Sequence, residues 1–465
     1  MNNPLWTWSA TALARGIAQG DVSSRQAVQA SLDRMAQVNP GLNAIVGDMR
    51  ASALQAADAA DAAVARGDRL GPLHGVPVSI KANVDLRGEP NSNGVVAFAG
   101  NIAADDSAVV ANLRQAGAVL VGQTNTPAFS MRWDTDNALH GRTRNPWSDQ
   151  HTPGGSSGGA SACVAAGMAP IAHGNDFAGS VRYPAYCTGL FGLRPSFGRV
   201  PSFNPSSTAE RPFHLQLMSV QGPLARCVAD IRLALAAMSQ EDVRDPWWVP
   251  APLAPAAASG PCRVALSTDP MGTGVHPHVA AALQRAASAL QDAGYTVEPV
   301  DPPAMADAVA GWHALARGEA AQFLADAVQR HGDAAIRQCF EWHMGRDVPT
   351  PAQYRLALAG RAQQLRAWSL FLRDHPIVLC PVSLAPPFLH GADTASEDSF
   401  YDIVRSQAPC FAVPFLGLPA LAAPTGLADG LPTGVQLIAA RFDEGRLLDA
   451  AEVLEQRFPF AFPAV

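Results

Sequence analysis

The sequence is almost without lysine. Of its 33 lysine and arginine residues, only Lys81 is a lysine. Arginine stays protonated in proteins, whereas a lysine amine loses its proton when it is desolvated or lies beside another cation. A role that needs a neutral nitrogen base would therefore retain a lysine, and Lys81 is a candidate general base. A lysine left by chance on the surface is the alternative.

Long apolar runs, an excess of basic charge and paired cysteines are also absent. No stretch approaches the roughly 18 to 20 apolar residues of a membrane span, and no secretory signal is visible at the start. The net charge of −7 argues against a nucleic-acid-binding protein. Seven scattered cysteines without a C-x-x-C pair suggest reduced thiols. We therefore expect a cytoplasmic protein.

The remaining composition indicates a well-buried α/β protein, with 48% hydrophobic and 16% charged residues in 465. Residues 1–70 are typical of a helical segment, with a helix start at 21–24. From residue 71, short apolar runs alternate with helices, as in an α/β sheet. The run at 77–81, PVSIK, predicts a buried strand that carries the Lys81 amine into the interior.

The second half of the chain contains the best candidate for a linker, the Pro- and Ala-rich stretch at 245–261. We predict a mostly helical insertion at 262–375, and we treat 1–465 as a single domain.

After Lys81, the segment at 153–161, PGGSSGGAS, is the second candidate for a functional site, because glycines allow main-chain N–H groups to approach a ligand. Ser156 and Ser157 both satisfy G-x-S-x-G, but a nucleophile elbow needs a preceding strand, and SDQHTP is polar and broken by proline. A phosphate-binding loop would need a lysine that is missing here. A plain linker or turn is the alternative.

Several motifs together resemble the amidase signature family of serine hydrolases, which cut carboxamides with a Ser-Ser-Lys triad. The resemblance runs nearly end to end and includes GPLHGVPVSIK at 71–81, GQTNTPAFS at 122–130, HGRTRNPW at 140–147, the long signature at 153–195, GPLAR at 222–226, and LGLPALAAPTG with LPTGVQLIAAR near the C-terminus. It implies an α/β fold with a large mixed β-sheet covered by helices on both faces.

The resemblance implies that Lys81 is the base, Ser156 is a bridging serine with a cis peptide, and Ser180 is the nucleophile. The residues alone do not choose Ser180 over Ser156 or Ser157; the family's spacing of its two serines does. A serine hydroxyl is a poor nucleophile until a base removes its proton, which a neutral lysine could do through Ser156.

In the family, main-chain N–H groups before the nucleophile form the oxyanion hole, which here implies Phe177, Ala178, Gly179 and Ser180. This sequence departs from the family pattern at Ala178, where a glycine is usual, and at Asn175, where a threonine is usual. It also has Ala82 after the lysine, where relatives often carry Asp, so a carboxylate that would favour the charged amine is missing.

Three further residues are expected to support the triad, namely Ser157, Asp176 and Arg182. The last two lie on either side of Ser180, and as a pair they could pin its loop through charge-assisted hydrogen bonds. A surface ion pair, worth under about 1 kcal/mol, is the alternative.

Substrate choice is less visible in the sequence. Met131, Trp133, Phe177 and Tyr183 lie close to the motifs and could line an apolar pocket, with ordinary core packing as the alternative. Arg132 and Asp134 flank Trp133 and could contact a polar group of the substrate, although charges in loops are more often solvated.

Histidines near the motifs offer a different base, at His140, His151 and His173. None has a nucleophile and an acid partner at a suitable spacing, so we favour structural roles for them. His276 and His278 lack supporting ligands for a metal site.

We therefore predict an enzyme that hydrolyses a carboxamide to a carboxylate and ammonia or an amine through a seryl acyl-enzyme. An A-type amidotransferase subunit, releasing ammonia within a tRNA-dependent complex, is the alternative from another class, and a non-catalytic binding protein is a third. We expect a small-molecule amide as the partner, without nucleic acid, membrane, cofactor or metal. A homodimer is left open.

Overall fold

The structure, a computed structural model, describes residues 3–253, 262–346 and 348–465. Within these residues, eleven strands form one mixed sheet. In spatial order the strands are β1 (Ile45–Asp48), β3 (Val119–Thr124), β2 (Pro77–Lys81), β4 (Ile171–Asp176), β6 (Val220–Ala225), β5 (Phe191–Arg194), β10 (Ala420–Ala428), β11 (Leu431–Ala439), β9 (Ile377–Cys380), β7 (Arg263–Leu266) and β8 (Thr296–Pro299).

Parallel and antiparallel pairs occur together in this sheet. Strand β2 is parallel to β3 and β4, and β7 is parallel to β8 and β9, whereas the other neighbours are antiparallel. The carboxyl ends of β2 and β4 therefore lie at the same edge of the sheet, which brings Lys81 close to Asp176 and to the loop that follows it.

Helices surround the sheet. In the first half of the described chain they are α1 (Ala10–Gln19), α2 (Ser24–Leu42), α3 (Arg50–Arg66), α4 (Ala108–Gln115), α5 (Gly158–Ala165), α6 (Arg182–Thr188), α7 (Phe213–Met218) and α8 (Val228–Met238). In the second half they are α9 (Pro277–Asp292), α10 (Met305–Phe323), α11 (Ala325–His331), α12 (Ala334–Met344), α13 (Pro351–Asp374), α14 (Ala392–Ala395), α15 (Glu397–Ser406), α16 (Ala408–Leu416) and α17 (Glu444–Arg457). Short 3₁₀ helices are η1 (Leu5–Thr7), η2 (Val96–Phe98) and η3 (Ala128–Ser130).

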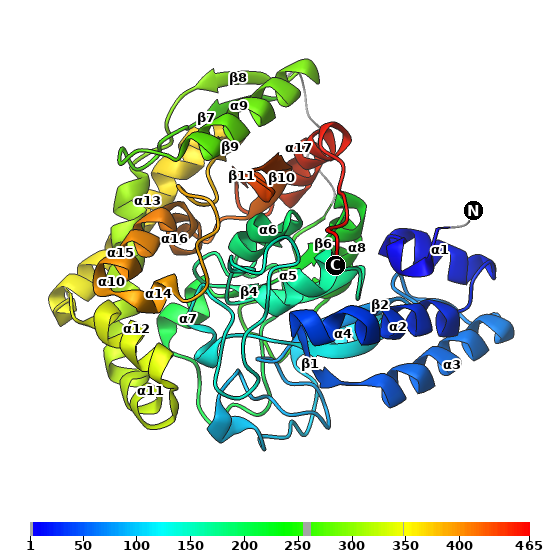
Figure 1. Cartoon of the computed structure of the whole chain (residues 1–465). Helices are drawn as coiled ribbons and strands as arrows, with labels where there is room; N and C mark the ends of the chain where they lie inside the picture. Colours follow the sequence, from blue (N-terminus) through cyan, green and yellow to red (C-terminus); the bar gives the residue numbers. More distant parts are fainter. Residues whose placement is uncertain (1–2, 254–261, 347) are drawn as a thin grey trace.

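The two faces of the sheet build separate cores because side chains alternate along each strand. On β10, Leu421 belongs to a hydrophobic cluster that includes residues of α1, α4, α8, α9 and α17, whereas Ala420 and Ala422, on the opposite face, belong to clusters that include residues of α5, α6, α10 and α16. The prediction of a large mixed sheet covered by helices on both faces is confirmed. Figure 1 shows α1, α2 and α3 on the right of the molecule and α10 to α13 on the left.

The N-terminal segment is mostly helical, as its sequence indicates. The Ser23 hydroxyl accepts from the Gln26 backbone N–H and the Gln26 side-chain oxygen accepts from the Ser23 backbone N–H, so a capping box begins α2 at the predicted place. The sequence did not indicate β1, which is only four residues long and pairs antiparallel with β3. So short a strand is stable only when it is paired, and β3 supplies the hydrogen bonds for β1.

The linker candidate at 245–261 is not a free connection over its first half. Val249 donates its N–H to Gly198, and the Trp247 ring packs against Phe197. Residues 254–261 of that prediction lie outside the described residues. The segment at 262–375, where the sequence predicts an insertion, contains α9 to α13 and also β7 and β8, which extend the sheet beyond β9.

Among the described residues, every helix is too short or too polar to cross a bilayer.

Candidate active site

Lys81 ends β2 inside the protein with none of its surface exposed. Its Nζ lies 2.7 Å from Ser156 Oγ, 3.0 Å from Ser157 Oγ and 2.8 Å from Asn175 Oδ1. Burial lowers the pKa of Lys81 well below the ordinary value of 10.5, and the negative charge of Asp176 opposes this only in part. The structure thus places a buried amine with a lowered pKa against three oxygen atoms.

A neutral amine has two N–H groups and one lone pair, and the three contacts could take up all three. Asn175 Oδ1 can only accept a hydrogen bond, so it takes one N–H. Ser157 Oγ donates to the Asn175 carbonyl at 3.5 Å, so it accepts the second N–H. The lone pair is left for Ser156, whose O–H lies at the shortest of the three distances.

Asn175 is a residue whose role the sequence did not indicate; it stood out only as a departure from the family pattern. Its Nδ2 donates to Asn83 Oδ1 at 2.9 Å, and Asn83 Nδ2 donates to Ser130 Oγ at 2.9 Å. These bonds orient the Asn175 amide so that its oxygen faces Lys81. The sequence signal that could have indicated this role is the position of Asn175, a polar residue directly before Asp176.

Ser156 lies in a tight loop between Gly154 and α5, and its bond to Gly155 is cis, as the resemblance implies. A side chain at Gly155 would lie 2.4 Å from the Arg132 carbonyl oxygen, so only glycine fits there. Ser157, next in the chain, donates its N–H to the Ser180 carbonyl at 3.2 Å. The glycine-rich loop therefore contacts both the end of β2 and the loop after β4.

Ser180 lies in the loop between β4 and α6 and exposes 8% of its surface, whereas Lys81 and Ser156 expose 1% or less. Gly179, just before it, has φ of +93°, and a Cβ there would lie 2.7 Å from the Cys410 side chain. A residue with a side chain would be strained as well as blocked at this position. The loop therefore presents Ser180 as the more accessible hydroxyl of the predicted triad.

The N–H groups that the resemblance assigns to an oxyanion hole are not equivalent. Gly179 donates its N–H to Asp176 Oδ1 at 3.0 Å, so this group is already bonded within the protein. Ala178 and Ser180 donate to no acceptor among the residues that the structure describes. The bond of the Gly179 N–H holds the loop, which leaves the N–H groups of Ala178 and Ser180 as the unbonded ones of these three within the described part of the chain.

Asp176 anchors this loop. Its carboxylate accepts from the N–H groups of Gly179 and Val181 and from the Arg182 side chain at 2.9 Å, and Arg194 lies 3.5 Å away. Burial alone would raise the pKa of Asp176, but the Arg182 and Arg194 charges lower it below 3.8. None of the carboxylate and guanidinium surfaces is exposed, so the pair is not a surface ion pair.

Replacement of Asp176 is expected to destabilise the fold. Asp176→Asn leaves two buried arginines without their anion, so we expect a loss of about 3 to 5 kcal/mol in the free energy of unfolding. Urea denaturation followed by circular dichroism measures it. Asp58→Asn is the matched control, because Asp58 pairs with Arg25 on the surface and its loss should cost under about 1 kcal/mol. Equal losses in both variants would contradict the anchoring role.

Arg132 and Asp134 are neither solvated nor free to contact a substrate, which corrects both alternatives for them. Arg132 forms a bidentate pair with Asp393 at 2.9 and 2.8 Å, and its side chain is 3% exposed. Asp134 lies 3.0 Å from the His390 ring and is fully buried. Both partners belong to the segment after β9, so these pairs fasten the loop of Trp133 to the C-terminal part of the chain.

The four pocket candidates lie in different surroundings, and Phe177, in the loop before Ser180, is half-buried. Tyr183 is fully buried, with its ring stacked on that of Phe388, so it packs in the core and does not line an open pocket. Met131 packs in a small cluster around η3. Trp133 is half-buried and its indole Nε1 donates to the Ala178 carbonyl at 3.3 Å. Of the other three, Trp133 directly contacts the loop of Ser180.

The three histidines near the motifs, His173, His151 and His140, have neutral polar partners in the structure. His173 Nε2 lies 2.8 Å from Gln221 Oε1, and burial lowers the pKa of His173 to about 4. His151 bonds to Ser148 and His140 lies near Ser92. Among the described residues, no group of three or more His, Cys, Asp or Glu side chains could hold a metal ion.

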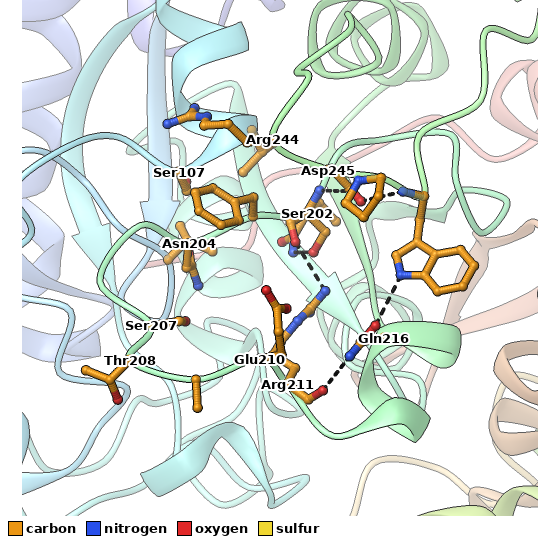
Figure 2. A pocket seen from close by; sticks show the side chains of 17 residues that line it. Ser107, Ser202, Asn204, Ser207, Thr208, Glu210, Arg211, Gln216, Arg244 and Asp245 are labelled. Carbon is orange, nitrogen blue, oxygen red and sulfur yellow. Dashed lines mark hydrogen bonds between the residues drawn. The ribbon is translucent and has the colours of Figure 1, made fainter.

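A cavity of about 560 Å³, lined by both polar and apolar side chains, lies next to the site, and Figure 2 shows the side chains around it. It is lined by residues that follow β2 and β5, including Val84, Ser202 and Asn204, and by Arg244 and Trp247. None of the three predicted triad residues lines it. Asn204 connects it to the site, because its Nδ2 donates to the carbonyl of Asn83 at 3.5 Å.

Comparison with known proteins places the chain in a family. The profile of the Amidase family matches residues 26–448. The chain is 46% identical over 459 residues to indoleacetamide hydrolase of Bradyrhizobium diazoefficiens, covering 98% of this chain and 87% of that protein. It is 32% identical to the A-type subunit of the glutamyl-tRNA(Gln) amidotransferase of Pseudomonas entomophila, covering 96% of both.

Among solved structures, a bacterial aryl acylamidase of the amidase signature enzymes superposes with a TM-score of 0.86 at 26% identity, covering 98% of both chains. This chain belongs to the amidase signature family, and it is an amide hydrolase that acts on carbon–nitrogen bonds.

Proposed function

We propose that the chain cleaves its amide through a seryl acyl-enzyme at Ser180, with Ser156 and Lys81 as the proton relay. The contact of 2.7 Å between the buried Lys81 nitrogen and Ser156 Oγ carries this proposal. Ser156 gives its proton to the Lys81 lone pair and takes the Ser180 proton, while Ser180 Oγ forms a bond to the carbonyl carbon.

The relay then runs in reverse. The proton held by Lys81 returns through Ser156 to the nitrogen of the leaving group as the C–N bond breaks, so ammonia or an amine departs and an ester of Ser180 remains. Water adds to the ester carbonyl with the same relay as base, and the carboxylate leaves. The N–H groups of Phe177, Ala178 and Ser180 hold the developing negative oxygen, where one donor contributes about 3 to 4 kcal/mol.

As the substrate we propose a primary amide of an arylacetic acid, with indole-3-acetamide as the first compound to test. The relative at 46% identity is an indoleacetamide hydrolase. Trp133 and Phe177 are half-buried aromatic side chains on the segments that surround Ser180, and aromatic walls suit a flat aryl group.

A panel of amides tests this substrate. Purified chain is incubated with indole-3-acetamide, phenylacetamide, acetamide and glutamine, and ammonia release gives kcat/KM for each. We expect indole-3-acetamide to exceed acetamide by about 100-fold or more, since one methylene in an apolar pocket already contributes about 1 to 3 kcal/mol. Equal values for all four compounds would contradict the aryl proposal.

The amidotransferase alternative is weaker, because the relative of that type is only 32% identical. The same panel separates the two. Hydrolysis of simple amides by the chain alone favours the free enzyme, whereas ammonia release from glutamine only after addition of a tRNA-binding partner protein would reverse the assignment.

We further propose that the enzyme acts in the cytoplasm on a small molecule, without nucleic acid. Support comes from its seven cysteines, which are free thiols in the structure, five of them buried. A homodimer stays a prediction.

A further inference from the structure

The loop before Ser180 lies between two tryptophans from distant parts of the chain. Trp312 of α10 donates its indole N–H to the Phe177 carbonyl at 3.1 Å, and Trp133 donates its indole N–H to the Ala178 carbonyl at 3.3 Å. The two acceptors are consecutive peptide groups of the predicted oxyanion loop. No other side chains donate to them among the residues that the structure describes.

These bonds fix the direction in which the loop's N–H groups point. In a planar trans peptide the carbonyl and the following N–H point in opposite directions. Since the Phe177 carbonyl faces Trp312, the N–H of Ala178 faces away from it. The next peptide is held at both ends, because Trp133 bonds its carbonyl and Asp176 accepts its Gly179 N–H.

One aromatic ring holds both donors in place. Phe411 of α16 stacks on Trp312 with ring centroids 4.5 Å apart, and it also contacts Trp133 at 5.7 Å. Phe411 is fully buried and Trp312 is 3% exposed. Rotation of either indole would therefore require repacking of this cluster.

We propose that Trp133 and Trp312 are positioning residues that orient the oxyanion loop, so that the Ala178 N–H faces the reacting carbonyl. This proposal rests on the proposed function of that loop. It also gives α10, within the segment at 262–375, a part in shaping the active site. The two indoles supply an external restraint at the point where the chain has Ala178 in place of the family's glycine.

The test compares variants that lose one indole N–H. Trp312→Phe and Trp133→Phe remove the donor and keep an aromatic ring, and Trp368→Phe is the matched control. Trp368 is also buried in this core, but its indole N–H has no partner among the described residues. We expect kcat to fall about 10- to 100-fold in the first two variants, with KM little changed in Trp312→Phe and the control near wild type.

A readout on the transition state separates positioning from general packing. A boronic acid analogue of the substrate, which forms a tetrahedral adduct on Ser180, should lose affinity in parallel with kcat/KM. A competitive ground-state inhibitor should bind as before. Loss confined to KM, or an equal loss in Trp368→Phe, would overturn the proposal.

Two measurements keep the test decisive. If Trp312→Phe does not fold, replacing the indole with its benzothiophene isostere removes the N–H and preserves the shape. If the wild type cleaves none of the aryl amides, the substrate proposal fails by itself, and the rate at which a fluorophosphonate labels Ser180 still compares the variants. Unchanged labelling in both tryptophan variants would then count against the indole donors.

Discussion

Ser180→Ala is expected to lower kcat by about 10⁶-fold, because the variant has no oxygen to form the acyl-enzyme. Steady-state ammonia release from indole-3-acetamide measures the loss. A fluorophosphonate should label the wild type at the peptide that carries Ser180 and should leave the variant unlabelled, as read by mass spectrometry. The fold should survive, because the change deletes a single oxygen from a residue at the edge of solvent.

Ser161→Ala is the matched control for this loss. Ser161 is fully buried in α5 of the same signature, and its hydroxyl donates to the carbonyls of Pro153 and Gly158 at 3.1 Å. We expect it to retain kcat within a few-fold. Full activity in Ser180→Ala would transfer the nucleophile to Ser156 or Ser157, the two serines that the sequence alone could not separate from it.

The parts of the site that the sequence could predict are those that depend on local pattern. A run of apolar residues that ends in the only lysine indicated the buried strand β2, and the structure has this strand over Pro77–Lys81. The glycines around Ser156 also indicated a tight loop from local pattern, because glycine adopts backbone conformations that other residues avoid. The family resemblance supplied Ser180.

The parts that the sequence could not predict depend on contacts between distant segments. Nothing in the sequence near Trp133 indicates that Trp312 bonds the Phe177 carbonyl, next to the Ala178 carbonyl that Trp133 bonds. Trp312 reaches this loop only because α10 packs beside the loop after β4. Arg132 looked solvated because its partner Asp393 lies far along the chain. A short motif shows which residues are present, whereas the orientation of a side chain is set by whatever folds against it.

Asn175 illustrates the intermediate case. Its position before Asp176 was visible, but the direction of its amide depends on Asn83, which lies two residues after Lys81, just past the end of the neighbouring strand. The contact joins the ends of β2 and β4, which are adjacent in the parallel part of the sheet. Sheet topology therefore determines which atom of Asn175 reaches the base.

Replacement of Lys81 is the second change with a very large expected effect. Lys81→Met and Lys81→Arg should each lower kcat by about 10³- to 10⁴-fold, because neither side chain offers a lone pair at neutral pH. Arg retains the charge and the donors, so its inactivity separates the need for a base from the need for a cation. Wild-type turnover in Lys81→Arg would remove the assignment of Lys81 as base.

The wild-type pH profile follows from the same amine. Protonated Lys81 cannot accept a proton, so kcat should fall about tenfold for each unit that the pH drops below the lowered pKa of Lys81, and it should be constant above it. Initial rates in buffers of constant ionic strength measure this limb. A profile that stays flat down to the range where carboxylates titrate would contradict a neutral lysine.

Stability provides a check on Lys81 that does not use activity. The amine of the unfolded chain holds its proton up to about the ordinary pKa of 10.5, whereas the folded protein loses it at a lower pH. Between these two pH values the unfolded state binds more protons, so the free energy of unfolding rises with pH by up to about 1.4 kcal/mol per unit. Lys81→Met lacks this titration. The difference in unfolding free energy between wild type and Lys81→Met, measured in urea at several pH values, should therefore increase with pH; a constant difference would mean that Lys81 stays charged in the folded protein.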